Sequence, residues 1–434
     1  MTTYWCERAW LPDGVAEAVR IEIADGRIVS VTANAQKTGT VLNGLTLPGF
    51  ANGHSHAFHR ALRGRTHHER GTFWTWRERM YSLAARLDPD SYYRLARGVY
   101  AEMVLAGYTS VAEFHYLHHG PGGKPYASPN AMGDALRQAA RDAGIRMTLL
   151  DTCYLAGGIG VPPDEVQQRF SDGSAENWAE RVALLKEDDL FRVGGAIHSV
   201  RAVPEYELPK VDNAVPEDRP LHIHLSEQRA ENEQCEAAYR WTPTGLLWDY
   251  GVLGERLTAV HATHLTEQDI KWLGESRSGV CFCPTTERDL GDGIGPARSL
   301  LDAGVRLGIG SDSNAVVDAF EETRALELDD RLASEERGRF TAEELLGAGT
   351  EHISAGWPET GTLVAGAGAD LVTVATDTVR TAGIEPSGVL FAAAAADVRT
   401  VVVAGREVVR DGAHVLIERP ETVLAKEIEA LWQF

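Results

Sequence analysis

The chain has few cysteines, no long apolar run and a shortage of positive charge. Its five cysteines are an odd number scattered over 434 residues, which excludes a disulfide framework and favours a reducing cytoplasm. No stretch approaches the roughly 18 uninterrupted apolar residues of a membrane span, and the first ten residues lack the apolar core of a signal peptide. With 44% apolar and 24% charged side chains, the composition is that of a soluble globular protein.

The charge balance constrains the partners. Lys and Arg number 42 against 63 Asp and Glu, so the formal net charge is −21. Long-range repulsion therefore argues against nucleic acid and against an anionic membrane surface. Inside a pocket, the electrostatic potential depends mainly on close and partly buried charges. The net charge of the whole chain therefore does not exclude an anionic small molecule as substrate.

Eight β-rich runs alternate with helix-forming segments through the middle of the chain. Strand and helix alternation repeated eight times predicts an α/β fold of the TIM-type (β/α)8 barrel class. The gap from residue 57 to about 90 is too long for a simple loop and predicts an insertion that covers the site. The runs cover residues 45–56, 108–116, 146–154, 192–200, 220–227, 257–265, 279–287 and 305–314.

Short strands punctuated by glycine occur at both ends of the chain. Residues 1–48 alternate in strand fashion, with an Asp-Gly hairpin signal at positions 25 and 26, and residues 360–415 return to the same style. We expect these two ends to form one small β-sandwich domain beside a barrel over residues 49–359. The last segment, 416–434, is predicted to be a helix that packs on the outside.

Each of the eight runs ends in polar or reactive side chains. In a barrel these positions are the carboxyl ends of the strands, where catalytic groups lie. They are His54 and His56, His115 and Tyr116, Cys153 and Tyr154, His198, His224 and Glu227, His261, Glu287, and Asp312.

A metal site is predicted from four of these ends. His54 and His56 are two residues apart on a strand, so both imidazoles face the same way. His224 and Asp312 could complete a set of three imidazoles and one carboxylate, which suits zinc and leaves one position open for water; iron or manganese would also be tolerated. His222 shares the face of His224, so spacing does not exclude it, but it lies deeper in the barrel. The fourth run, RVGGAIHSV, has no lysine to bridge two metals, which favours one ion.

Two further strand ends have the chemistry of proton transfer. Glu227 lies just beyond the strand of His224, where its carboxylate could reach both a water and a substrate nitrogen. His261 would point inward from the sixth run and polarise the substrate. A non-catalytic barrel kept as a scaffold is a remote alternative, and it would be expected to have lost ligands that are all present here.

Other residues are expected to have no role in catalysis. We expect Cys281 and Cys283 to be buried apolar side chains, and His67, His68, His118 and His119 to be exposed in loops. Trp74 and Trp76 are expected to pack the insertion against the barrel.

Several motifs of the chain are similar to those of a known enzyme superfamily. LPGFANGHSH, HLSE, VHATH and GIGSDS, with an ADLVTV segment and a VVVAGREVVRDG tail, resemble the mononuclear deaminase-like branch of the amidohydrolase superfamily over essentially the whole chain. More narrowly, HSHAFHRAL, FWTWRERMY, AGYTSVAEFHYLHH and HSVRAV are similar to the formimidoylglutamate deiminases. The resemblance implies a homodimeric hydrolase of histidine degradation that converts N-formimino-L-glutamate to N-formyl-L-glutamate and ammonia.

Carried over by position, the resemblance implies a role for each site residue. Such a substrate has a cationic amidine and two carboxylates, and arginines bind carboxylates in a bidentate manner. The chain departs from the family at His59, where glutamine is expected, and at Asn314, where some members have histidine. The implied set is zinc (Zn2+, with Fe2+ as the alternative) on His54, His56, His224 and Asp312, proton handling by Glu227, His261 and Asp312, and substrate binding by Arg77, Tyr116, His198, Arg201 and His59.

Two enzymatic alternatives remain within the superfamily. One is another deaminase acting on a nucleobase or cyclic amidine, and the other is an imidazolonepropionase. Glu287 stands where many nucleobase deaminases have asparagine, which argues mildly against a purine or pyrimidine substrate, and its carboxylate could instead hold an arginine.

Overall fold

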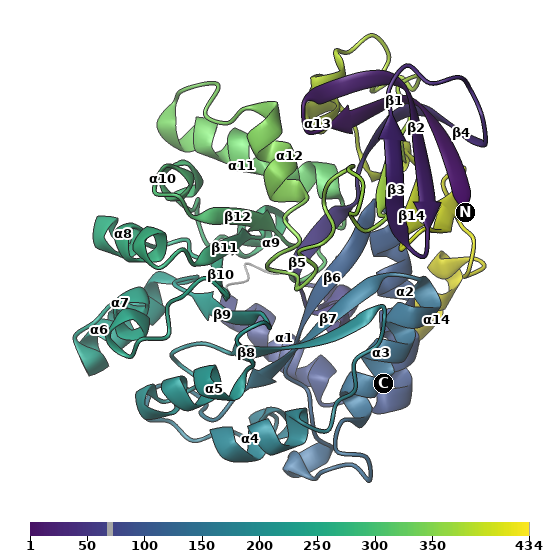
Figure 1. Ribbon diagram of the computed structural model, residues 1–434. Helices are drawn as coiled ribbons and strands as arrows, with labels where there is room; N and C mark the ends of the chain where they lie inside the picture. The colour runs from purple at the N-terminus through teal and green to yellow at the C-terminus, as the bar shows by residue number, and fades with distance from the viewer. Residues whose placement is uncertain (67–72, 434) are drawn as a thin grey trace.

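A closed ring of parallel strands lies at the centre of the computed structural model, which describes residues 1–66 and 73–433 (Figure 1). The eight strands pair in sequential order, each parallel to the next. A parallel bridge between Ser55 and Asp312 brings the last strand back to the first. The predicted barrel is thereby confirmed. Its strands are β5 (Phe50–Ser55), β6 (Tyr108–His115), β7 (Arg146–Cys153), β8 (Phe191–Ile197), β9 (Leu221–Leu225), β10 (Leu257–His261), β11 (Gly279–Phe282) and β12 (Arg306–Ile309).

Helices follow the strands, and most of them lie around the ring in Figure 1. Several begin at side-chain caps; Asp88 and Thr266, for example, each accept from the backbone of the first turn and take part in a capping box. The helices of the barrel are α1 (Phe73–Ala84), α2 (Pro89–Leu105), α3 (Ala131–Ala143), α4 (Ala175–Val182), α5 (Leu208–Ala214), α6 (Arg229–Tyr239), α7 (Pro243–Asp249), α8 (Glu267–Glu275), α9 (Pro284–Leu290), α10 (Ala297–Asp302), α11 (Ala319–Ser334) and α12 (Ala342–Gly349).

A second sheet of eight strands is built from both ends of the chain. β4 and β13 pair antiparallel and so join the N-terminal strands to the C-terminal ones. The strands predicted as a sandwich form one continuous hydrogen-bonded sheet, which has a small apolar core of its own around Ile21 and Val402. In spatial order they are β16 (Ala413–His414), β15 (Arg406–Arg410), β14 (Val398–Val403), β13 (Leu371–Val374), β4 (Thr40–Pro48), β1 (Thr2–Leu11), β2 (Gly14–Ala24) and β3 (Arg27–Thr32).

The first predicted run, 45–56, is divided between the two sheets. Its first part ends β4 at Pro48, and the chain passes through Gly49 into β5 of the barrel. A Cβ atom on Gly49 would lie 2.2 Å from Oγ1 of Thr109, so only glycine fits at this crossing. The passage places the metal-ligand motif of β5 directly after the strand that anchors the second sheet.

Two contacts attach the second sheet and the last helix to the barrel. Arg146 of β7 donates to Asp370, next to β13, with a 2.8 Å contact from Nε, and both side chains are buried. The last helix, α14 (Pro420–Trp432), packs on α2, where Leu424 lies so close to Gly98 that a Cβ there would be 2.6 Å from its Cγ. The short helix α13 (Val389–Ala392) precedes β14.

Across residues 1–66 and 73–433, every helix is too short or too polar to cross a membrane.

Candidate active site

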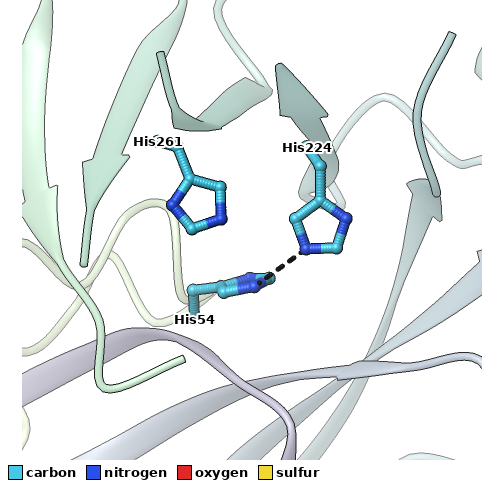
Figure 2. A group of neighbouring side chains, drawn as sticks. All are labelled: His54, His224 and His261. Atoms are coloured by element: carbon cyan, nitrogen blue, oxygen red, sulfur yellow. Dashed lines mark hydrogen bonds between the residues drawn. The ribbon is translucent and has the colours of Figure 1, made fainter. Parts of the chain in front are cut away.

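Four side chains converge at the carboxyl end of the barrel. His54 lies on β5 and His56 follows it, His224 lies on β9, and Asp312 follows β12. Nε2 of His224 is 3.1 Å from Nε2 of His54 and 3.3 Å from Nε2 of His56. Oδ1 of Asp312 is 3.4 Å from Nε2 of each of the β5 histidines. Figure 2 shows His54 and His224 facing each other, with the imidazole of His261 beside them.

These separations fit a metal of the size of zinc. Zinc binds imidazole nitrogen at about 2.0–2.1 Å, and two such bonds at a tetrahedral angle place the nitrogens about 3.3 Å apart. The four ligand atoms predicted from the sequence are thus brought together by the structure at the spacing that such an ion requires.

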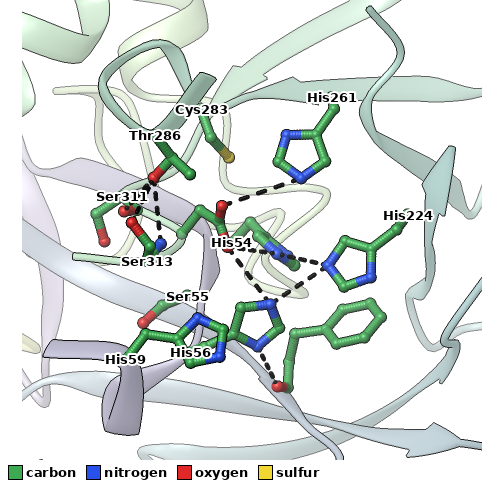
Figure 3. Close-up of polar contacts among 12 residues, drawn as sticks. His54, Ser55, His56, His59, His224, His261, Cys283, Thr286, Ser311 and Ser313 are labelled. Carbon is green, nitrogen blue, oxygen red and sulfur yellow. Dashed lines mark hydrogen bonds and ion pairs between the residues drawn. The ribbon is translucent and has the colours of Figure 1, made fainter. Parts of the chain in front are cut away.

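Backbone contacts set the orientation of two imidazoles. Nδ1 of His56 donates to the carbonyl of Phe114 at 2.8 Å, a bond marked by a dashed line from His56 in Figure 3. Nδ1 of His224 donates to the carbonyl of His198 at 3.0 Å. A carbonyl only accepts, so in a neutral ring the hydrogen lies on Nδ1 and the lone pair on Nε2. The Nε2 lone pairs therefore point at one another, an arrangement that a shared cation stabilises.

The charge states agree with this arrangement. Burial lowers the pKa of His54 to about 3, which keeps its imidazole neutral at physiological pH. Burial alone would raise the pKa of Asp312, but the imidazoles around it, that of His54 first, hold it well below its ordinary value. The centre is a neutral imidazole set with one carboxylate.

An asparagine ties the two strand ends of the centre together. The Nδ2 of Asn314 donates to the backbone carbonyls of His56 and Asp312, both at 3.1 Å, and its Oδ1 accepts from Ser311. Asn314 was noted in the sequence only as a departure from the family, and its position directly after the GSDS motif was the available signal.

His261 stands between three carboxylates. Its Nδ1 donates to Glu287 at 3.2 Å, and its Nε2 lies 3.9 Å from Glu227 and 4.0 Å from Asp312. Burial alone would lower the pKa of His261, but the carboxylates, Glu227 first among them, raise it well above its ordinary value. Burial also raises the pKa of Glu227. The interpretation of Glu287 as the partner of an arginine is wrong, because Glu287 accepts from His261 and from the backbone of Cys283.

The residues assigned to the substrate line the same cavity as the metal ligands. Nε2 of His59 lies 2.9 Å from the hydroxyl of Tyr116, and Nε of Arg201 lies 3.8 Å from the buried carboxylate of Glu231. Helix α1 of the predicted insertion covers the cavity with Arg77. The residues lining it are His56, His59, Trp76, Arg77, Met80, Tyr81, Tyr116, Tyr154, Phe170, His198, Arg201, His224, Glu227, His261, Leu290 and Asp312.

The structure shows where the histidines and cysteines that were expected to lie outside the active site are found. His118 and His119 are buried rather than exposed, because the loop that carries them packs against Arg169, whose carbonyl accepts from both backbone N–H groups. Cys281 and Cys283 are buried and free. His222 donates from Nε2 to the backbone carbonyl of Ser354 at 2.8 Å, and so lies apart from the four candidate ligands.

Two interpretations lie partly outside the described residues. His67 and His68 fall in the segment 67–72, and the side chain of Trp74 is likewise outside the described part. Trp76 is described, and its ring meets that of His59 edge-on at 5.1 Å between centroids.

Three residues of the cavity region were given no role from the sequence. Tyr81 follows Arg77 by one helical turn, a spacing that could have indicated it. Tyr154 was noted only as a polar strand end. Gln167 comes from the loop after β7 and contacts both tyrosine hydroxyls, at 3.0 and 2.9 Å, and nothing in the sequence distinguishes it.

Comparison with known proteins agrees with this geometry. A family model described as "Amidohydrolase family" matches residues 45–408, and one described as "Formimidoylglutamate deiminase HutF, N-terminal domain" matches residues 1–40. The formimidoylglutamate deiminase of Pseudomonas aeruginosa is 39% identical, covering 96% of this chain and 97% of its own. The 8-oxoguanine deaminase of the same organism is 28% identical, covering 92% of both chains.

Solved structures show the same fold. The crystal structure of an amidohydrolase from Brucella melitensis superimposes with a TM-score of 0.93 at 34% identity and covers 100% of both chains. An atrazine chlorohydrolase from Arthrobacter aurescens, complexed with zinc, superimposes with a TM-score of 0.87 at 24% identity and covers 99% of this chain and 100% of its own.

Proposed function

Because this chain belongs to the amidohydrolase family, we propose that it hydrolyses the formimino group of N-formimino-L-glutamate to give N-formyl-L-glutamate and ammonia. One observation supports this most strongly: three members of the three-histidine, one-carboxylate centre, His56, His224 and Asp312, line one cavity together with Arg77 and Arg201. The centre suits hydrolysis of a C–N bond, and the arginines suit a substrate with two carboxylates.

We assign the metal site to His54, His56, His224 and Asp312, with zinc as the ion. The chemistry of the donor set supports this assignment, since three imidazole nitrogens and one carboxylate are ligands that zinc prefers. When bound, the ion would supply Lewis-acid activation of a water for attack on the formimino carbon.

The protons are handled by the carboxylates and His261. Asp312 accepts the proton that the attacking water loses, and its carboxylate is kept ionised by the surrounding imidazoles. Glu227 delivers a proton to the departing nitrogen, so that ammonia leaves and the carbon becomes a formyl group. His261, held by Glu287 through Nδ1, directs its Nε2 toward the reacting centre and stabilises the oxygen that carries the developing charge.

The substrate is oriented by its carboxylates. Arg77 comes from helix α1 and Arg201 from the loop after β8, so the two guanidinium groups reach the cavity from different elements. Tyr116, His198 and His59 line the same cavity as the two arginines. Binding both carboxylates holds the formimino group in place for attack.

A substrate panel tests the assignment. Purified protein with zinc should release ammonia from N-formimino-L-glutamate, and it should release none from guanine or cytosine and leave the absorbance of imidazolonepropionate unchanged. Ammonia from a nucleobase but not from formiminoglutamate would replace the proposal with the nucleobase alternative.

Glu227→Gln tests the proton transfer. The variant should lower kcat by about 10²–10⁴ while zinc stays bound, because Glu227 is not a ligand. Glu236→Gln, the same change at an exposed position of the next helix, is the matched control and should leave kcat unaltered. Near wild-type turnover by Glu227→Gln would show that another group carries the proton.

A further inference from the structure

Neutral hydroxyl groups surround the guanidinium of Arg77. Its Nε donates to the hydroxyl of Tyr81 at 2.7 Å, and its Cζ lies 5.0 Å from the centre of the Tyr81 ring. Tyr154 lines the same end of the cavity as Arg77 and Tyr81. The bond from Nε to Tyr81 orients the guanidinium.

Gln167 connects the two tyrosines. Its Nε2 donates to the hydroxyl oxygen of Tyr81 at 3.0 Å and to that of Tyr154 at 2.9 Å. Its Oε1 accepts from the backbone N–H of Asp164 at 2.8 Å, which fixes the orientation of the amide. Both amide hydrogens are therefore used on phenol oxygens, and both oxygens act as acceptors.

The O–H hydrogens of Tyr81 and Tyr154 are not used in the bonds from Gln167, in which both oxygens accept. The oxygen of Tyr81 accepts from Gln167 and from Arg77, so its own hydrogen must point elsewhere. Among residues 1–66 and 73–433, neither hydroxyl donates to a carbonyl or carboxylate, and both tyrosines line the cavity. Both O–H groups are therefore placed to donate to a ligand in the cavity.

We propose that Tyr81 and Tyr154, held by Gln167, donate hydrogen bonds to the substrate carboxylate that Arg77 binds. The proposal rests on the proposed function and extends it to specificity. The guanidinium of Arg77 and the O–H groups of Tyr81 and Tyr154 are all donors, so a carboxylate, which only accepts, is matched there. A primary amide would place its own N–H groups against donors and is rejected. Tyr81 and Tyr154 bind the substrate directly, and Gln167 is a positioning residue.

Steady-state kinetics of Tyr81→Phe and Tyr154→Phe test the direct contacts. Each should raise KM for N-formimino-L-glutamate about tenfold, as expected for one lost hydrogen bond to a charged group, and should change kcat little. Tyr93→Phe is the matched control, because its hydroxyl bonds to Asp142 on the outside of the barrel, and its KM should equal that of the wild type.

Substrate analogues with a single carboxylate show which of the two substrate carboxylates Tyr81 contacts. N-formimino-4-aminobutyrate lacks the α-carboxylate and N-formimino-L-2-aminobutyrate lacks the γ-carboxylate. The KM penalty of Tyr81→Phe should disappear with one of them and persist with the other. A full penalty with both, or no penalty with N-formimino-L-glutamate, overturns the proposal.

Gln167→Glu tests the positioning role. The variant keeps the shape of the side chain, but its carboxylate accepts from both hydroxyls and turns their hydrogens away from the substrate. KM should rise as in the tyrosine variants, with kcat and the melting temperature close to wild type; an unchanged KM contradicts the role.

Calorimetry with N-formyl-L-glutamate separates this proposal from the proposed function. If the wild type neither turns over formiminoglutamate nor binds the product, the function is wrong and this inference falls with it. If the wild type does both and Tyr81→Phe binds the product equally well, only the inference is wrong.

Discussion

Within residues 1–66 and 73–433, two buried clusters that contain histidine and aspartate can be compared, and they differ in what lies at their centre. One is the set of His54, His56, His224 and Asp312 described above. The other, also near the carboxyl ends of the barrel strands, consists of His115, His118 and Asp151 on and after β6 and β7.

In the second cluster a protein side chain supplies the positive charge. Arg181 of α4 donates to both oxygens of Asp151, each at 2.8 Å, and also to Asp172. Trp178 adds a further N–H at 2.9 Å to Asp151, and Nε2 of His118 lies 2.9 Å from the carbonyl of Thr152. Because a guanidinium already occupies the carboxylate, this cluster is structural.

In the first cluster, no arginine or lysine among the described residues contacts Asp312 as Arg181 contacts Asp151. The imidazole Nε2 atoms face one another and Asp312 at 3.1–3.4 Å. The same residue types therefore occur in two different surroundings, and the position of the nearest arginine distinguishes them. Residue type alone is an insufficient criterion for proposing a metal site.

The largest effect is expected from Asp312→Asn. Loss of the only carboxylate in the first cluster should release the metal and lower kcat by about 10³ or more. Asp151→Asn, the same change in the second cluster, should leave the metal content at the wild-type value. Elemental analysis and the ammonia assay on both variants check this, and an unchanged metal content in Asp312→Asn would remove the distinction between the clusters.

A smaller effect, on stability rather than chemistry, is expected from Arg181→Met. It leaves two buried carboxylates without their partner, which costs about 3–5 kcal/mol of unfolding free energy. Arg141→Met, which removes a half-exposed partner of Asp188, should cost no more than about 1 kcal/mol. Urea unfolding measures both, and equal costs would show that the second cluster is not held by its guanidinium.

The smallest effect is a pH dependence of the second cluster. Burial alone would raise the pKa of Asp151, but Arg181 outweighs burial and lowers it to about 2. With an unfolded value near 3.9, the ion pair stabilises the fold above about pH 4 and loses this contribution as the pH falls toward about 2. The stability difference between wild type and Asp151→Asn should therefore shrink between pH ~6 and pH ~3.5 in urea titrations. A constant difference would contradict the lowered pKa.

The barrel and the four candidate ligands could be predicted because they depend on local pattern. The eight runs alternate with helix-forming segments, and the polar strand ends lie where parallel strands converge, so His54, His56, His224 and Asp312 could be selected as candidates without the fold. The run 45–56 divides between the two sheets at Gly49, where the sequence placed the boundary between the two domains, but the close approach of Thr109 that requires glycine there could not be predicted.

The residues that hold the site in place were the ones that pattern could not reveal. His118 and His119 appear as loop residues in sequence, and they are buried because Arg169, some fifty positions later, packs over them. Glu287 was paired with an arginine on charge alone, whereas in space its neighbour is His261. Gln167 acts through contacts with residues far away in the sequence, which carry no local signature.

The central claim is that the first cluster holds one metal ion and the second holds none. Anomalous diffraction from a zinc-loaded crystal, recorded on both sides of the zinc absorption edge, tests it most directly. The account predicts one peak, enclosed by His54, His56, His224 and Asp312. A peak between His115, His118 and Asp151, or no peak at the first cluster, would contradict it.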